Sequence, residues 1–233
     1  MLWNNKNFEI NNWRKEIKFR IDMLTEKEII HIIKLNPFLF SDIFSYRHVN
    51  NIYLDTFEKQ NYYNSVEGLS SRIKVRIRWY GPLFGFIEKA VLEIKVKKNH
   101  RNTKLSFKLQ PFQFERGFSI ESIQNVLETS EIPDLLKINL QTFEATLVNR
   151  YCRCYFLCAN KVFRITLDKD LEYYSVYPTE NCFFNNVSEE GIFVLEIKAD
   201  DSEKTPISQV SNHFPFRMTK NSKYTSGIDL LKM

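Results

Sequence analysis

Glycine and proline are scarce in this sequence of 233 residues, which has 6 Gly and 7 Pro against 20 Phe and 11 Tyr. So few linker-forming residues exclude long low-complexity segments and extensive disorder. The chain has no uncharged run of membrane-spanning length, and its start, Met1–Asn7, lacks the apolar core of a signal peptide. We therefore expect an ordered cytoplasmic protein without direct membrane insertion.

Three kinds of functional motif are also missing. The four cysteines (Cys152, Cys154, Cys158 and Cys182) match neither a zinc spacing nor a disulfide framework, and the first three share strand parity, which predicts buried, reduced thiols. No Walker loop for phosphate is present. A net charge of +5 is too small to indicate duplex nucleic acid, so no nucleic-acid partner is expected. The placement of the charges is more informative than their sum.

Charged and apolar residues alternate from Arg72 to Tyr80, which is the period of a β-strand. On an extended chain Arg72, Lys74, Arg76 and Arg78 leave one face and the apolar residues between them leave the other. Neighbours on one face lie about 6.7 Å apart, so each pair of cations repels by roughly 2.5 kcal/mol at an effective dielectric of about 20. For an isolated strand, a solvated outer face is the simpler interpretation.

The same alternation returns in segments far apart in the sequence: residues 16–20, 92–97, 164–168 and 195–198, and more weakly 104–108. Each presents a polar face that carries Lys or Arg, and most add a carboxylate. A sheet curled into a barrel would bring these faces together around one lumen. Cations interrupted by acids suit a polyanion and a divalent metal.

The remaining pattern predicts an α+β fold, an antiparallel β-barrel with helices packed outside. Further strands are expected over residues 49–55, 145–155 and 161–168, and helices over residues 25–36, 119–129, 133–140 and 206–210, with a turn or short helix over 56–64. A capping box begins the first helix at Thr25, and Thr205 is expected to cap the last with Pro206 as its first residue. If the cysteines face the core, Arg153 points into the lumen and Arg150 away from it. The whole chain, 1–233, is expected to be a single domain.

Eight short motifs occur in a fixed order. They are Glu16-Ile17-Lys18, Tyr53-Leu54-Asp55, Arg72 to Gly81, Leu92 to Lys97, Tyr151-Cys152-Arg153, Arg164 to Asp168, Leu195 to Lys198 and Ser222-Lys223-Tyr224. In this order the chain resembles, over residues 14–227, the VTC catalytic domain. That is the polyphosphate polymerase domain of the vacuolar transporter chaperone family, a relative of the CYTH-like triphosphate tunnel metalloenzymes.

The resemblance implies a triphosphate tunnel fold that transfers the terminal phosphate of ATP to a growing inorganic polyphosphate chain with Mn²⁺ or Mg²⁺. The implied catalytic residues are Arg76, Arg78, Lys95, Arg153, Arg164 and Lys223. Phosphate binding is expected from these and from Lys18, Arg72, Lys74, Lys97, Lys198 and Lys220. Glu196 falls where the family's metal-binding carboxylate sits, and Glu16, Glu93 and Asp168 are further metal candidates.

One departure bears on the type of reaction. Many tunnel triphosphatases carry a Glu-x-Glu-x-Lys signature, but Arg14 stands here where the first Glu would be. That favours a transferase over a hydrolase. Two alternatives stay open: a tunnel triphosphatase that hydrolyses tripolyphosphate or a nucleotide, and a non-catalytic polyphosphate-binding module.

Overall fold

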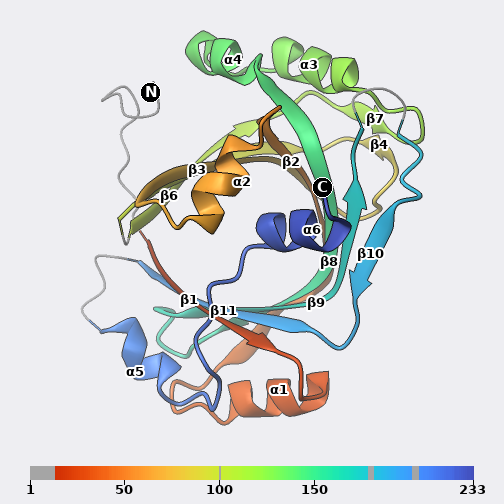
Figure 1. Ribbon diagram of the computed structural model, residues 1–233. Helices are drawn as coiled ribbons and strands as arrows, with labels where there is room; N and C mark the ends of the chain where they lie inside the picture. The colour runs from red at the N-terminus through yellow and green to blue at the C-terminus, as the bar shows by residue number, and fades with distance from the viewer. Residues whose placement is uncertain (1–13, 100, 178–180, 201–204) are drawn as a thin grey trace.

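The computed structural model describes residues 14–99, 101–177, 181–200 and 205–233 (Figure 1). The N-terminal stretch on which the signal-peptide expectation rests lies outside these residues. The strands are β1 (Arg14–Ile21), β2 (Ser41–Thr56), β3 (Ser71–Tyr80), β4 (Gly85–Ile87), β5 (Val91–Lys98), β6 (Arg101–Lys108), β7 (Phe112–Phe114), β8 (Phe143–Leu157), β9 (Arg164–Ser175), β10 (Asn186–Glu189) and β11 (Phe193–Asp200). The helices are α1 (Glu26–Lys34), α2 (Gln60–Val66), α3 (Ile120–Thr129), α4 (Asp134–Leu140), α5 (Ile207–Ser211) and α6 (Lys223–Leu231).

Nine strands form one sheet in the order β10-β9-β11-β1-β6-β5-β3-β2-β8, and β8 also pairs with β9. This last pairing closes eight strands into a ring, and β10 extends the sheet beyond β9. All the pairings in it are antiparallel. The predicted antiparallel sheet curled on itself is confirmed. The junction between β1 and β6, here called the seam, has one register pair within the described residues, Arg14 opposite Asn102.

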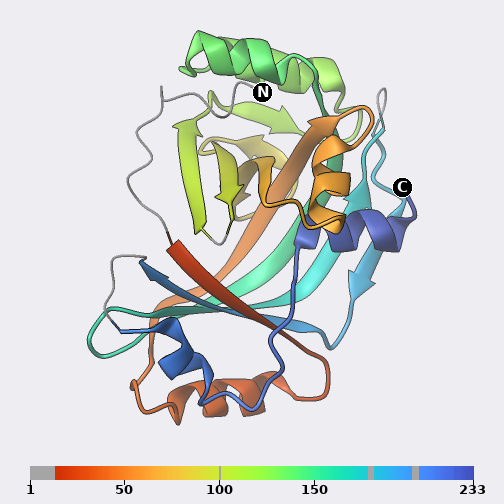
Figure 2. The ribbon, with the colours of Figure 1, turned by 60° about the vertical axis from the view of Figure 1, so that its left-hand side comes forward.

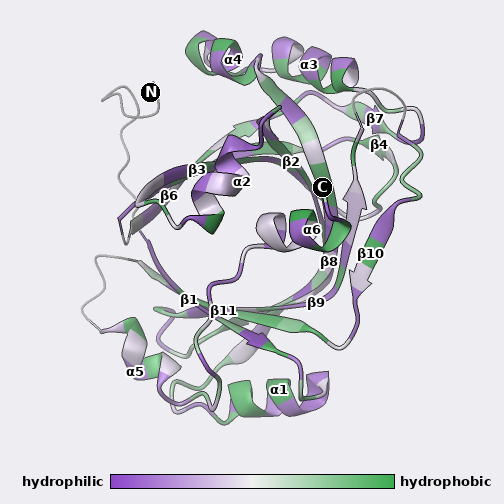
Figure 3. Cartoon of the chain, in the orientation of Figure 1, coloured by the Kyte–Doolittle hydropathy of each residue, from purple (hydrophilic) through white to green (hydrophobic). Residues whose placement is uncertain are grey.

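The alternation in β3 has the predicted effect. Val75, Ile77 and Trp79 are each 1% exposed on the outer face, whereas Lys74, Arg76 and Arg78, which alternate with them, face the lumen, the space enclosed by the inner faces of the ring. Hydrophilic and hydrophobic residues alternate along the strands of the ring in the same way (Figure 3).

Two hydrophobic cores cover the outer face of the ring. One lies beneath α3, α4 and the β4–β7 pair and includes Trp79, Leu92 and Phe114. The other lies beneath α1 and α5 and includes Ile29 and Leu195. The two groups of helices lie on opposite sides of the ring (Figure 1). Burial of the outer face leaves the inner face for polar side chains.

Helix α1 begins as its sequence predicts. The hydroxyl of Thr25 accepts a hydrogen bond from the backbone N–H of Glu28, and the Glu28 carboxylate accepts one from the backbone N–H of Thr25. The predicted cap of α5 is wrong: that helix begins at Ile207, with Pro206 at the cap position and no side-chain cap. Helices α3 and α4 match their expected ranges closely.

Helix α6 departs from the expectation that helices pack outside the ring. From α5 the chain runs past β1, where the backbone N–H of Thr219 bonds to the carbonyl of Lys18 at 2.8 Å, and then enters α6 (Figure 2). Tyr224 stacks on the inner-face ring of Tyr53, with centroids 5.0 Å apart. A third apolar cluster therefore lies inside one end of the ring and includes Leu147, Tyr173 and Ile228.

No helix in the described part of the chain is long and apolar enough to cross a membrane. All four cysteines are free thiols, and three of them, Cys152, Cys154 and Cys158, are buried as their parity predicts.

Candidate functional site

The first part of the site comes from three adjacent strands, β3, β5 and β6. The carboxylate of Glu93 accepts hydrogen bonds from Arg76 at 2.8 Å and from Lys104 at 2.6 Å, and Arg78 lies 3.4 Å away. Burial alone would raise the pKa of Glu93, but these three cations overcome it and hold that pKa below its usual range. Glu93 therefore stays ionised and fixes the two arginines in place.

The second part joins β8, β9 and α6. Asp168 is fully buried and receives both a bidentate pair from Arg153, at 2.5 and 2.7 Å, and the ammonium of Lys223 at 2.5 Å. Burial would raise the pKa of Asp168, yet Arg153 and Lys223 keep it below its ordinary value. Both cations also lie against the ring of Tyr151, at 5.0 and 4.6 Å from its centroid. The parity argument for Arg153 thus placed it on the inner face correctly.

The third part lies on β1 and β11, where each inner-face lysine of one strand is opposite a glutamate of the other. Glu196 is opposite Lys18, and Glu16 is opposite Lys198. Lys18 and Lys198 lie 3.5 and 3.3 Å from the Glu196 carboxylate, and Glu16 bonds to Lys95 on β5 across the seam. Burial would raise the pKa of Glu196, but Lys18 and Lys198 hold it well below its usual range.

Lys74 differs from its neighbours because no carboxylate pairs with it among the described residues. Its ammonium donates to the hydroxyl of Ser222, the N-cap of α6, at 2.5 Å. Burial, and then the nearby cations Lys18, Lys95, Arg72 and Arg76, lower the pKa of Lys74 well below its ordinary value. The protein thus holds an incompletely neutralised ammonium group where several other cations converge.

Nine basic side chains of the described residues meet four carboxylates in the lumen, an excess of five positive charges. The basic ones are Lys18, Lys74, Arg76, Arg78, Lys95, Lys104, Arg153, Lys198 and Lys223, and the acidic ones are Glu16, Glu93, Asp168 and Glu196. Like charges are costly when water is excluded. The surplus favours occupation of the lumen by a multivalent anion.

Four of the expected phosphate-binding residues lie away from this cluster. Burial, followed by the charges of Arg72 and Lys220, lowers the pKa of Lys97, so these three cations are near one another. Arg72 itself bonds to the carbonyl of Leu69, outside the ion-pair cluster. Arg164 is exposed at the start of β9, opposite Lys198. They flank the central site.

Several uncharged groups organise the lumen. The sequence patterns missed Asn51 and Asn149 among them, whereas strand parity places Tyr151 in the lumen together with Arg153. Arg78 donates to the side chains of Asn51 at 2.9 Å and Tyr151 at 3.1 Å, and Asn51 in turn donates to Asn149. Lys104, on a strand where the alternation is weak, was also missed. Asn51, Asn149 and Lys104 could have been found in the sequence only by strand parity, because they lie on the same face as the predicted cations, as Asn149 does with Arg153.

The carboxylates fit a metal site only in part. In the described ranges no three carboxylate, histidine or cysteine side chains could hold an ion by themselves. Glu16 and Glu196 lie diagonally on one face of the β1–β11 ladder, a relation that spans about 7–8 Å. Mg²⁺ commonly takes one or two carboxylates and completes its shell with substrate phosphates, and Mn²⁺ also prefers oxygen ligands. Glu196 and Glu16 therefore suit a metal that arrives with a phosphate substrate.

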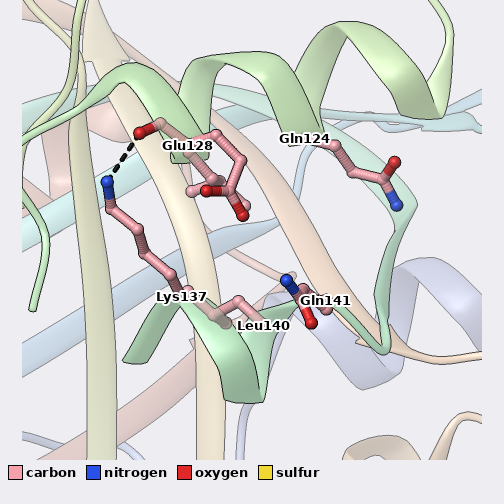
Figure 4. Close-up of a pocket in the computed structure, with 6 residues that line it drawn as sticks. Gln124, Glu128, Lys137, Leu140 and Gln141 are labelled. Atoms are coloured by element: carbon pink, nitrogen blue, oxygen red, sulfur yellow. Dashed lines mark hydrogen bonds between the residues drawn. The ribbon is translucent and has the colours of Figure 1, made fainter. Parts of the chain in front are cut away.

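A shallow pocket of about 300 Å³ lies outside the ring between α3 and α4 (Figure 4). Lys137 closes one side of it by donating to the carbonyl of Glu128 at 2.6 Å. The pocket has a single cation, already engaged, and so lacks the charge of the lumen.

The closed antiparallel sheet around a charged lumen is the triphosphate tunnel fold, and comparisons with known proteins agree with it. The VTC domain family matches residues 13–232, so the chain belongs to the VTC domain family. A search of curated proteins found no significant match.

Two solved structures share the fold at low sequence identity. One is a candidate adenylate cyclase from Vibrio parahaemolyticus, 13% identical, with a TM-score of 0.53 over 94% of this chain and 99% of its own. The other is a candidate adenylyl cyclase from Hippeastrum described as having a dominant triphosphatase activity, 12% identical, with a TM-score of 0.50 over 94% of this chain and 96% of its own.

Proposed function

We propose that this protein transfers the terminal phosphate of ATP to a growing inorganic polyphosphate chain inside the lumen, with Mn²⁺ or Mg²⁺. The observation that supports it most directly is Lys74, a partly buried ammonium among four other cations with a hydroxyl as its side-chain partner. A row of phosphates supplies the missing negative charge. Phosphoryl transfer requires mainly positioning and charge neutralisation, which such a lumen can provide.

Distinct roles follow for the arginines, lysines and carboxylates. The guanidinium groups of Arg76, Arg78 and Arg153 are fixed by their ion pairs and can bind phosphate oxygens in a defined orientation. Lys95 and Lys223 supply further charge at the transferred group, and Arg164 receives the phosphates at the edge of the site. Lys18, Lys198 and Lys74 bind along the chain of phosphates, with Arg72, Lys97 and Lys220 nearer the opening.

For the metal, we propose Glu196 as the first ligand and Glu16 as the second, together with substrate phosphates. A bound ion would neutralise charge that develops on the phosphates during transfer. Glu93 and Asp168 remain candidates, but each already holds two or three cations, which favours a task in positioning the arginines.

Membership of the VTC domain family and the Arg14 departure support a transferase. The triphosphatase description of the Hippeastrum protein supports the alternative that the lumen hydrolyses triphosphates.

The test is incubation with ATP and Mn²⁺, with separate assays for polyphosphate on a gel and for orthophosphate release from tripolyphosphate. Chain growth supports the proposal. Orthophosphate release without chain growth would establish the triphosphatase instead, and tight binding without either reaction would leave a binding module.

Two variants test the assignment of residues. Lys74→Gln is expected to weaken tripolyphosphate binding at least tenfold. Glu196→Gln should keep or tighten binding, because it removes a negative charge, and should lose turnover. The matched controls Lys27→Gln and Glu58→Gln change exposed side chains outside the site. If the wild type is active and both Lys74→Gln and Glu196→Gln equal it in binding and turnover, the assignment of the site is refuted.

A further inference from the structure

Four side chains at the end of the lumen opposite α6 have no task in phosphate binding. They are Phe44 and Arg47 of β2, Tyr80 of β3 and Tyr155 of β8, here called the aromatic rim. Tyr80 continues the inner-face alternation of Arg76 and Arg78, and Tyr155 continues that of Tyr151 and Arg153. Phe44 is 50% exposed and Tyr80 52% exposed, so each residue keeps about half of its surface open to solvent.

The rim is an ordered arrangement. The rings of Phe44 and Tyr155 meet edge to face with centroids 5.6 Å apart. The guanidinium of Arg47 lies 4.2 Å from the Phe44 centroid and 5.8 Å from that of Tyr155, and no carboxylate of the described residues pairs with it. The β2–β8 register shifts on both sides of Phe44. Such irregularities re-aim side chains beside functional sites.

The rim is continuous with the phosphate-binding part of the lumen. Arg47 is directly opposite Arg153 in the β2–β8 ladder. The guanidinium of Arg153 lies 5.0 Å from the ring of Tyr151 and 5.9 Å from that of Tyr155. One two-residue step along β8, about 6.6 Å, therefore separates a phosphate-binding group from an aromatic surface.

An inorganic polyphosphate has no group that gains from an aromatic surface, whereas a nucleoside triphosphate carries a planar base beyond its phosphates. Bases stack on aromatic rings and on guanidinium planes. We propose that the aromatic rim binds the base of the nucleoside triphosphate donor while its phosphates enter the lumen. This inference rests on the proposed function, since it names the part of that site which distinguishes the nucleotide from inorganic phosphates.

The test compares the affinities of the full chain for ATP, ribose 5-triphosphate and tripolyphosphate, measured by calorimetry with EDTA present so that no ligand is consumed. Phe44→Ala is expected to weaken ATP binding at least fivefold and to change tripolyphosphate binding less than twofold. Phe44→Tyr, which keeps a ring, should restore ATP binding. Phe184→Ala is the matched control, because Phe184 is 74% exposed and also has an arginine, Arg116, 5.0 Å from its centroid.

The outcomes separate this inference from the proposed function. Tight ATP and tripolyphosphate binding that Phe44→Ala leaves unchanged would refute the base site and keep the phosphate site. If Phe44→Ala weakened the binding of ATP and of tripolyphosphate equally, the base site would also be refuted. The ring would then affect phosphate binding or the stability of the fold, and not the base. Wild-type affinity for ribose 5-triphosphate equal to that for ATP would exclude a contribution of the base. Absence of binding by all three ligands would refute the proposed function and the rim with it.

Discussion

At the scale of single residues, Asp168 is the carboxylate that neutralises two cations of the lumen at once. It is fully buried and holds both Arg153 and Lys223. Removal of one member of a buried ion pair leaves the other charge without compensation, which costs about 3–5 kcal/mol. We predict that Asp168→Asn lowers the free energy of unfolding by about 3 kcal/mol in urea titrations.

The matched control is Asp42→Asn. Asp42 pairs with Lys34 at 2.9 Å, but both side chains are more than half exposed. Pairs of this kind contribute about 0–1 kcal/mol. An equal decrease in the free energy of unfolding in the two variants would show that the ion pairs of Asp168 with Arg153 and Lys223 stabilise the fold no more than an exposed pair does.

Lys74 gives a prediction about protons. In the unfolded chain its pKa is near 10.5, whereas burial and the neighbouring cations lower it in the folded protein. Between the lowered pKa and 10.5 the folded protein binds fewer protons than the unfolded chain, so Lys74 makes stability rise with pH in that window. A bound polyanion favours the charged ammonium and raises the pKa again.

Binding of tripolyphosphate at pH 8–9 should therefore take up protons. Calorimetry in two buffers of different ionisation enthalpy measures this uptake. Lys74→Met should reduce it, whereas Lys27→Met, at an exposed position, should not. Identical uptake by both variants would assign the protons to another group.

Strand parity predicted which charged residues face the lumen, because alternation follows from backbone geometry alone. Arg153 and Arg76 are examples. The turn at residues 81–85 predicts a hairpin in which Arg76 lies beside Glu93, and the two residues pair. The contact of Arg153 with Asp168 was not predicted. A search for charge did not find Asn51, a neutral group that accepts a hydrogen bond from Arg78. Tyr151, which also accepts from Arg78, was placed in the lumen by its parity with Arg153.

At the scale of elements, α6 depends on Gly227. A Cβ at this position would lie 2.5 Å from a methyl group of Leu147 and 2.6 Å from the ring of Tyr173. Overpacking of this kind typically costs about 1–3 kcal/mol. We predict that Gly227→Ala destabilises the docked helix and, by displacing Lys223 and Ser222, weakens tripolyphosphate binding severalfold.

Ser226→Ala is the control at the adjacent position of the same helix, because the side chain of Ser226 forms no hydrogen bond with another described residue. Unfolding titrations and ligand calorimetry on both variants make the comparison. If the Gly227→Ala protein were destabilised but bound tripolyphosphate with full affinity, α6 would not contribute to phosphate binding.

The helices differ in how well their sequences predicted them. Helix α1 has a capping box and an apolar stripe, and both are present in the structure. Helix α6 was missed because Thr225, Ser226 and Gly227 are poor helix formers, so its strongest local signals are the Ser222 cap and Ile228. Its stability comes from contacts with β8 and β9, which are distant in sequence.

At the scale of the whole molecule, the repeated alternation predicted a sheet with one polar face but not the order of its strands. The first and last strands of the ring pair with each other, β1 with β11, and β2 pairs with β8 across a long separation in sequence. Such pairings depend on which outer faces can be buried together beneath the helices. Local sequence does not contain that information, and the resemblance gave the tunnel fold without the order of its strands.

At the seam between β1 and β6, the described residues are joined by one register pair and, on to β5, by the ion pair of Glu16 with Lys95. A polyphosphate bound to Lys18 of β1 and to Lys74 and Lys95 of β3 and β5 would bridge this seam. We predict that tripolyphosphate slows amide hydrogen exchange in β1 and β6 more than in β8 and β9, which pair along most of their length. A ligand that only stabilises the folded state slows all globally exchanging amides together. Uniform protection would therefore show that the anion does not bridge the seam, whereas protection concentrated there would show that the bound anion links β1 to β3 and β5.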